Sequence, residues 1–124
     1  MPTFKARIMV VEQDSQASAF MAEALYRQGC EVIVVRDSRR AIAIAESQVP
    51  HAFLLNLAMP QPDGFRLCKI LRAHPNFKNT PILLITTLDA TDSKIVAIGA
   101  GATNYLVKPF CTDELISRVQ DLLP

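Results

Sequence analysis

Two hydrophobic patterns alternate along this chain of 124 residues, and their alternation restricts the fold more than any other feature. Nearly continuous apolar runs of four to six residues are typical of strands that are covered on both faces. Such runs lie at residues 7–11, 31–35, 52–55, 81–86 and 104–107. Between them apolar residues recur three and four positions apart, as at Ala17, Phe20, Met21 and Ala24, which predicts amphipathic helices.

Residues that begin and end helices stand at the borders of these segments. Candidate N-terminal caps are Asp14 or Ser15, Asp37 or Ser38, Asp63, and Asp89 or Thr91. Five strands and five helices in strict alternation predict an α/β fold, a parallel sheet with helices on both faces. No linker, repeat or low-complexity stretch interrupts the pattern, so residues 1–124 are predicted to form a single domain.

Composition excludes several classes of function. The net charge of +1 gives no reason to expect nucleic acid or an anionic membrane as a partner. No apolar run approaches the roughly 20 residues that span a bilayer, and the N-terminal segment lacks the features of a signal peptide. Cys30, Cys68 and Cys111 show no metal-ligand spacing, which favours a reducing, cytoplasmic setting.

Polar residues follow the predicted strands at their carboxyl ends. In an open parallel sheet this edge holds the active crevice. The residues there are Glu12, Gln13 and Asp14 after the first strand, Asn56 after the third, Thr86 and Thr87 after the fourth, and Lys108 after the fifth. The sequence therefore predicts a functional site at this edge, with an amide where such chemistry usually has a carboxylate.

Four stretches together resemble the response-regulator receiver domain of two-component signalling: IMVVE (8–12), LAMPQPDGF (57–65), PILLIT (81–86) and GATNYLVKPF (101–110). The resemblance covers the whole chain and implies a flavodoxin-like, doubly wound (βα)5 fold with strand order 2-1-3-4-5. Residues 64–86 are also similar to receivers attached to diguanylate cyclases and hybrid kinases.

The resemblance also implies roles for single positions. In the family an acidic pair holds Mg²⁺ together with a backbone carbonyl, an aspartate accepts a phosphoryl group, and a lysine contacts the phosphoryl oxygens. The acidic pair aligns with Glu12 and Gln13, the acceptor with Asn56, the carbonyl with Ala58 and the lysine with Lys108.

Further positions align with the family's switch. Thr86 matches the switch hydroxyl and Tyr105 the switch aromatic. Pro109 is a candidate for a cis peptide bond with Lys108. Thr87 stands where the family has a smaller residue, and its bulk is expected to narrow the mouth of the pocket.

Two departures from this pattern carry the functional prediction. An amide has no nucleophilic oxygen comparable to a carboxylate, so Asn56 cannot form an acyl phosphate. Gln13 and Asn56 remove two charges that Mg²⁺ would need, so binding of Mg²⁺ is expected to be weak or absent. Glu12, Lys108 and the two amides are expected to form a closed polar network instead, although Gln13 could equally be a solvated loop residue.

These considerations predict a pseudo-receiver that is not an enzyme and that acts through protein–protein interaction, independently of phosphorylation. The expected interaction face is built from the fourth helix, fifth strand and fifth helix, including Lys94, Ile95, Ile98 and Tyr105. The expected partner is another protein or an output domain, with a histidine kinase or a diguanylate cyclase as candidates, and a second copy of the chain is a further candidate at this face. Two alternatives stay open: a pocket that senses a small ligand or anion, and an engineered phospho-dead form of a conventional response regulator.

Overall fold

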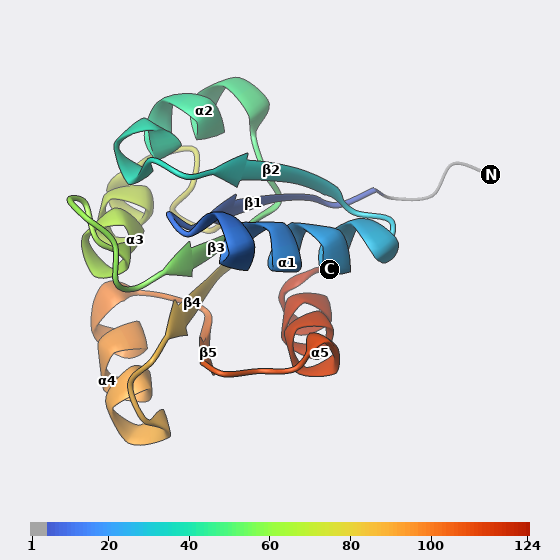
Figure 1. Cartoon of the computed structure of the whole chain (residues 1–124). Helices are drawn as coiled ribbons and strands as arrows, with labels where there is room; N and C mark the ends of the chain where they lie inside the picture. Colours follow the sequence, from blue (N-terminus) through green and yellow to red (C-terminus); the bar gives the residue numbers. More distant parts are fainter. Residues whose placement is uncertain (1–4) are drawn as a thin grey trace.

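A parallel five-stranded sheet forms the centre of the computed structural model, which describes residues 5–124 (Figure 1). The first four residues of the predicted 1–124 domain and of the N-terminal segment lie outside the described part. The strands run in the order β2-β1-β3-β4-β5, which confirms the predicted fold class and strand order. Their bounds are β1 Arg7–Val11, β2 Glu31–Val35, β3 Ala52–Asn56, β4 Ile82–Thr86 and β5 Asn104–Val107.

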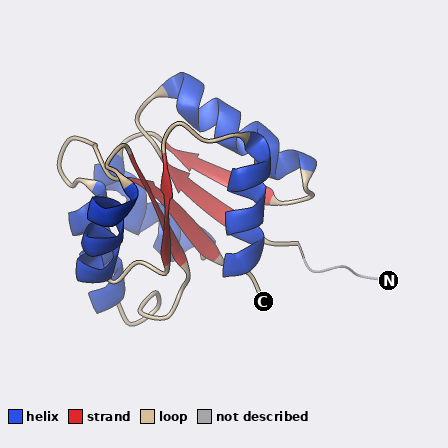
Figure 2. Ribbon diagram, turned by 90° about the horizontal axis from the view of Figure 1, so that it is seen from below, coloured by secondary structure: helices blue, strands red, loops and turns tan. Residues whose placement is uncertain are grey.

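Helices cover both faces of the sheet (Figure 2). α1 and α5 pack on one face, and α2, α3 and α4 pack on the other. Their bounds are α1 Ser15–Arg27, α2 Ala41–Gln48, α3 Gly64–Ala73, α4 Ala90–Ala100 and α5 Thr112–Leu122, with a 3-10 turn η1 at Ser38–Arg40 before α2. None of the helices in the described part is long and apolar enough to cross a bilayer.

The sheet separates two apolar cores, and alternate strand residues feed each of them. Met9 packs on the α2–α4 side and Ile8 on the α1–α5 side. All five residues of both β3 and β4 are buried. This two-sided burial is the physical reason why the strands read as continuous apolar runs.

Strand and helix ends differ slightly from the sequence prediction. β3 extends to Asn56, because that residue still pairs with Ile85 of β4. Aspartates supply the side-chain caps of α1, α3 and α4: Asp14 accepts from the N–H of Ala17, Asp63 from that of Arg66 and Asp89 from that of Asp92. Asp37 caps η1 in the same way by accepting from the N–H of Arg39.

Candidate functional site

The site lies where β1, β3 and β5 end. Glu12 follows β1, Asn56 is the last residue of β3 and Lys108 follows β5. The loop after β3 returns tightly over this edge, because the N–H of Gly64 donates to the carbonyl of Leu57 at 2.9 Å. A Cβ on Gly64 would collide with the Asn56 carbonyl, so only glycine allows this approach.

One carboxylate joins these residues, and we call Glu12, Asn56 and Lys108 the Glu12 network. Lys108 Nζ donates to Glu12 Oε1 at 3.0 Å, and Asn56 Nδ2 donates to Glu12 Oε2 at 3.0 Å. Asn56 Nδ2 also donates to the carbonyl of Ala58 at 3.0 Å. The N–H of Asp14 adds a bond to Glu12 Oε2 at 3.2 Å. Both oxygens of the carboxylate are therefore satisfied.

The central residues of the Glu12 network are buried, so their polar groups need partners within the protein. Glu12 is 1% exposed and Asn56 is 8% exposed. A carboxylate at such depth is costly unless it is paired and hydrogen-bonded, and Lys108 supplies the compensating charge. Asn56 must present an NH2 group here, because both of its partners are acceptors. The predicted pair of Glu12 and Lys108 is thus present, and Asn56 bridges it to the loop after β3.

Gln13 does not take part in the network. It is exposed, and none of the hydrogen bonds found among residues 5–124 involves its side chain. Its backbone carbonyl accepts from Arg36 Nε at 3.2 Å. The expectation of a network that contains both amides is therefore wrong for Gln13, whose side chain makes none of the bonds to Glu12, Asn56 or Lys108. The alternative of a solvated loop residue describes its position.

The residues aligned with the switch lie next to the network but do not join it. Thr86 is buried, and its Oγ1 accepts from the N–H of Leu88 at 2.9 Å. Tyr105 is half-buried, with the Arg118 guanidinium 5.8 Å from its ring centroid. Thr87 is exposed and lines a separate apolar hollow with Phe20, so it does not narrow the mouth above Asn56 as expected.

The remaining predicted positions are exposed or at the rim. The peptide bond between Lys108 and Pro109 is cis. On α4, Ile95 is 64% exposed and Ile98 70% exposed, and Lys94 is exposed beside them. These α4 side chains and the half-buried Tyr105 are the residues that we predicted to form an interaction face.

Mg²⁺ does not fit the donor set at this site. No group of three His, Cys, Asp or Glu side chains that could hold a metal occurs among residues 5–124. Within the Glu12 network the one anion is Glu12, whose two oxygens already accept from an ammonium and an amide. Asp14 lines the same hollow, but its carboxylate caps α1. Asn56 presents N–H bonds, not lone pairs, and Lys108 repels a cation.

Sequence reasoning missed the place of Arg36. In the sequence it stands with Arg39 and Arg40 in a short basic cluster, a pattern that is typical of a solvated helix face. Arg36 directly follows β2 at the same sheet edge and lines the hollow above Asn56. Its position one residue after a strand of the parallel sheet was the signal that could have placed it there.

The fold and the residues at its strand ends define a class of protein. A model of the response regulator receiver domain matches residues 8–120, and the chain belongs to this family. Among curated relatives, the transcriptional regulatory protein TcrA of Mycobacterium tuberculosis is 37% identical over 116 residues, which make up 94% of this chain and 45% of TcrA. The chain spans about half the length of the curated relatives it matches.

Solved structures agree with this assignment. The chemotaxis response regulator CheY4 of Vibrio cholerae superimposes with a TM-score of 0.91 at 30% identity, over 97% of this chain and 100% of that one. The beryllofluoride-activated receiver domain of Klebsiella pneumoniae RstA gives a TM-score of 0.85 at 28% identity, over 94% of this chain and 97% of that one. Receiver domains of this kind interact with kinases and output domains in two-component signalling.

Proposed function

We propose that this chain is a pseudo-receiver, which signals through protein contacts and does not cycle through a phosphorylated state. The observation that carries the proposal is the Glu12 network. At the acceptor position implied by the resemblance, Asn56 points an NH2 group at Glu12 Oε2 and at the Ala58 carbonyl. An aspartate there would bring a third oxygen within about 3 Å of two others, a distance that needs a cation or a proton between them.

The NH2 group of Asn56 occupies the place that such a cation would take between the oxygens. It supplies two N–H bonds to the two acceptors, while Lys108 balances the charge of Glu12. The site therefore needs no metal to hold its strand ends together. Asn56 offers no carboxylate oxygen to a phosphoryl donor, so we propose that the protein is not an enzyme. The exposed amide Gln13 removes a second carboxylate, which favours a natural adaptation over a single engineered change.

The proposed output surface lies on α4, β5 and α5. Ile95 and Ile98 are exposed apolar residues three positions apart on α4, so they share one face of the helix. Adjacent exposed apolar side chains are typical of surfaces that contact another protein. Their conformation is set by the sequence and not by phosphate. The expected partner is a histidine kinase, a diguanylate cyclase, another output domain or a second copy of this chain.

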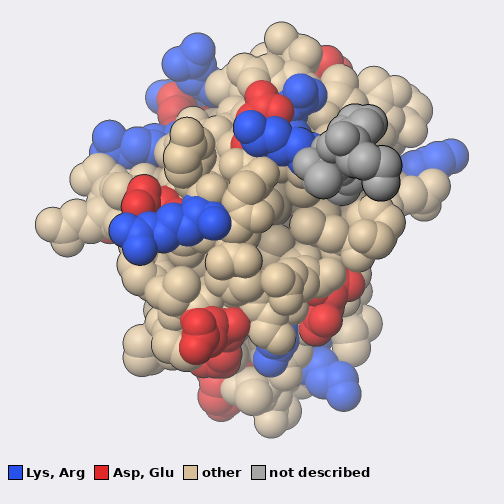
Figure 3. All heavy atoms as spheres, turned by 90° about the vertical axis from the view of Figure 1, so that its right-hand side faces the viewer, with Lys and Arg blue, Asp and Glu red and all other residues tan. Residues whose placement is uncertain are grey.

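Other parts of the proposal follow from the surface and the family. Acidic and basic side chains are interspersed on the face shown in Figure 3, which supports a protein partner over nucleic acid. We propose that the protein is cytoplasmic and that residues 1–124 form one receiver domain.

Beryllofluoride, which mimics a bound phosphoryl group, tests the proposal directly. The ¹⁵N-labelled protein is titrated with Mg²⁺ and beryllofluoride, and the amide shifts of Asn56, Ala58, Thr86 and Lys108 are followed. We expect these shifts to stay unchanged. The matched control is the double variant Asn56→Asp with Gln13→Asp, which restores both carboxylates and should respond.

Specific shifts at Asn56 and Lys108 in the unaltered protein would contradict the proposal, because they would show an intact phosphoryl site. If the double variant also shows no amide shifts, a feature outside these two positions prevents beryllofluoride from binding. The proposal would then lose its physical basis in the Glu12 network.

A further inference from the structure

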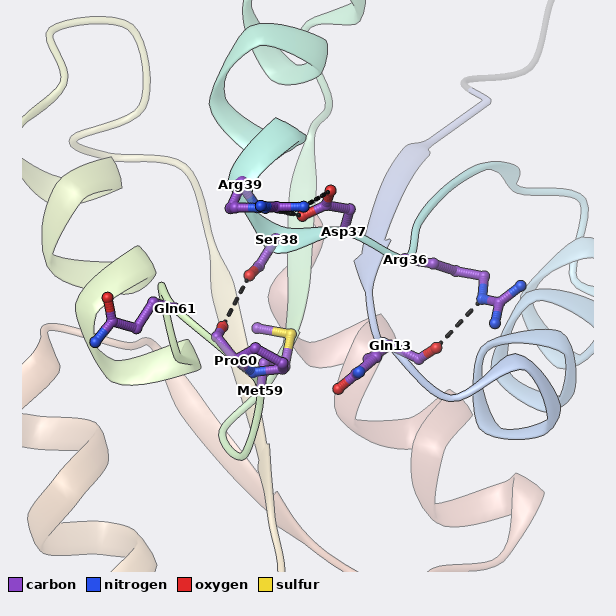
Figure 4. Close-up of a pocket in the computed structure, with 8 residues that line it drawn as sticks. All are labelled: Gln13, Arg36, Asp37, Ser38, Arg39, Met59, Pro60 and Gln61. Carbon is purple, nitrogen blue, oxygen red and sulfur yellow. Dashed lines mark hydrogen bonds and ion pairs between the residues drawn. The ribbon is translucent and has the colours of Figure 1, made fainter.

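A hollow lies beside the Glu12 network on its β2 side (Figure 4). It encloses about 540 Å³ between the turn after β2, the loop after β3 and the residue after Glu12. A second hollow of about 510 Å³ opens above Asn56, and Gln13 and Arg36 line both. Sites for small molecules commonly measure about 300–1,000 Å³, so either hollow has the size of a ligand site.

Arg39 and Asp37 form an ion pair that lines one wall of the first hollow. Arg39 donates to both carboxylate oxygens of Asp37, at 3.0 Å from Nε and 3.0 Å from Nη2. The contact with Arg39 also lowers the pKa of Asp37 from its ordinary value. Across the hollow lie Met59 and Pro60, and Ser38 ties the two walls together by donating to the Pro60 carbonyl at 3.1 Å. Guanidinium planes and thioethers both pack favourably against flat aromatic rings.

Gln13 supplies an unused polar edge to this hollow. In Figure 4 its side-chain amide points toward Met59 and Pro60. A glutamine amide carries a donor and an acceptor side by side, which suits the N6–H and N7 groups of adenine. The amide that the Glu12 network does not use is therefore placed where a heteroaromatic ring would lie between the two walls.

Arg36 supplies the unpaired charge. Its Nε is anchored to the Gln13 carbonyl at 3.2 Å, and no partner for its two Nη groups is found among residues 5–124. A guanidinium fork with two free groups matches the oxygens of a phosphate. The neutral amide of Gln13 also favours binding of a phosphate beside Arg36, because a carboxylate at that position would repel the anion.

We propose that this hollow binds an adenine nucleotide. The base lies between the Arg39–Asp37 pair and Met59, its edge meets the Gln13 amide, and the phosphate meets Arg36. The inference goes beyond the proposed function, since a ligand can bind here whether or not Asn56 accepts a phosphoryl group. It gives Gln13 and Arg36 a joint role that the Glu12 network does not.

The test is an NMR titration of the ¹⁵N-labelled protein with AMP, adenosine and inorganic phosphate in separate arms. AMP is expected to shift the amides of Gln13, Arg36, Arg39 and Met59 in a saturable way, and to bind at least about tenfold more tightly than adenosine or phosphate alone. Arg36→Met should weaken AMP binding about tenfold or more. Arg40→Met removes the same charge from an exposed residue that lines neither hollow, and it should leave binding unchanged.

Gln13→Glu is the second test variant, and it should weaken AMP binding while leaving the thermal midpoint of the protein close to its original value. The proposal is overturned if AMP causes no saturable shifts at these amides, if Arg36→Met and Arg40→Met have equal effects, or if inorganic phosphate binds as tightly as AMP. These readouts are separate from the response to beryllofluoride at Asn56, so failure of one proposal is distinguishable from failure of the other.

Discussion

Asn56→Asp is the substitution that probes the Glu12 network most sharply, because it changes one donor group and almost nothing in shape. The amide Nδ2 that lies 3.0 Å from Glu12 Oε2 and 3.0 Å from the Ala58 carbonyl becomes a carboxylate oxygen. Two hydrogen bonds are lost, and two negative charges then face each other in a buried site. The variant should therefore be less stable than the original protein when no divalent cation is present.

The size of the effect follows from these contacts. A hydrogen bond to a charged group contributes about 1.5–3 kcal/mol and one to a carbonyl about 0.5–1.5 kcal/mol, so about 2–4.5 kcal/mol is lost with the donor. Charge repulsion adds to this loss, but the new carboxyl can escape it by taking up a proton. Protonation at pH 7 costs at most about 4 kcal/mol from an ordinary pKa of about 3.9, and it restores one donor. We expect a loss of about 2–4 kcal/mol in the free energy of unfolding.

Urea unfolding in EDTA and in excess Mg²⁺ measures this loss. Mg²⁺ should restore much of the stability of Asn56→Asp, because a cation that binds only the folded state stabilises it by mass action. It should leave the original protein unchanged. The matched control is Asn79→Asp, which adds the same charge at an exposed asparagine and should shift the midpoint only slightly.

The reasoning is refuted if Asn56→Asp is as stable in EDTA as the original protein. That result would mean that the amide donor of Asn56 contributes nothing to holding Glu12 in place. A loss of stability that Mg²⁺ does not reverse would equally contradict the idea that the amide takes the place of a cation.

Further predictions concern Lys108, Gly64 and two of the cysteines. Lys108→Met should lower the free energy of unfolding by about 1–3 kcal/mol, because it leaves the buried Glu12 carboxylate without its cation. The loss is smaller than for a fully buried pair, since the lysine side chain is 27% exposed. Chemical denaturation measures it. Gly64→Ala should cost about 2–3 kcal/mol by the same assay, because its new Cβ meets backbone atoms that cannot move aside. Iodoacetamide should label the exposed Cys111 rapidly and Cys68 slowly, since burial raises the pKa of the Cys68 thiol. Because the pKa of the Cys68 thiol is higher in the folded protein than in the unfolded chain, the unfolded chain loses this proton at a lower pH. The free energy of unfolding should therefore fall as the pH rises above about 8.5.

The sequence was sufficient to predict the fold, because each element carries its own local signal. Apolar runs mark strands buried on both faces, and aspartates such as Asp14 and Asp63 mark helix starts. The meeting of Glu12 and Lys108 was also predictable, since both follow strands of one parallel sheet and carry opposite charges.

The positions of Gln13 and Thr87 were not predictable in the same way. Both follow strand ends, where the side-chain direction is set by one or two backbone torsions in a loop and not by the period of a strand. Gln13 stays outside the Glu12 network and lines the two hollows beside it, and Thr87 lines the hollow beside Phe20. Arg36 shows the reverse case, because a residue that reads as part of a solvated basic cluster lies at the rim of the site.

The most direct test of the central claim is the reaction of the protein with a small phosphoryl donor. The protein is incubated with acetyl phosphate and Mg²⁺ and its intact mass is measured, with the double variant Asn56→Asp and Gln13→Asp as the positive control. We predict no added phosphoryl group on the original protein and one on the double variant. A phosphoryl group on the original protein that disappears when one specific side chain is substituted would contradict the claim that this receiver works without phosphorylation.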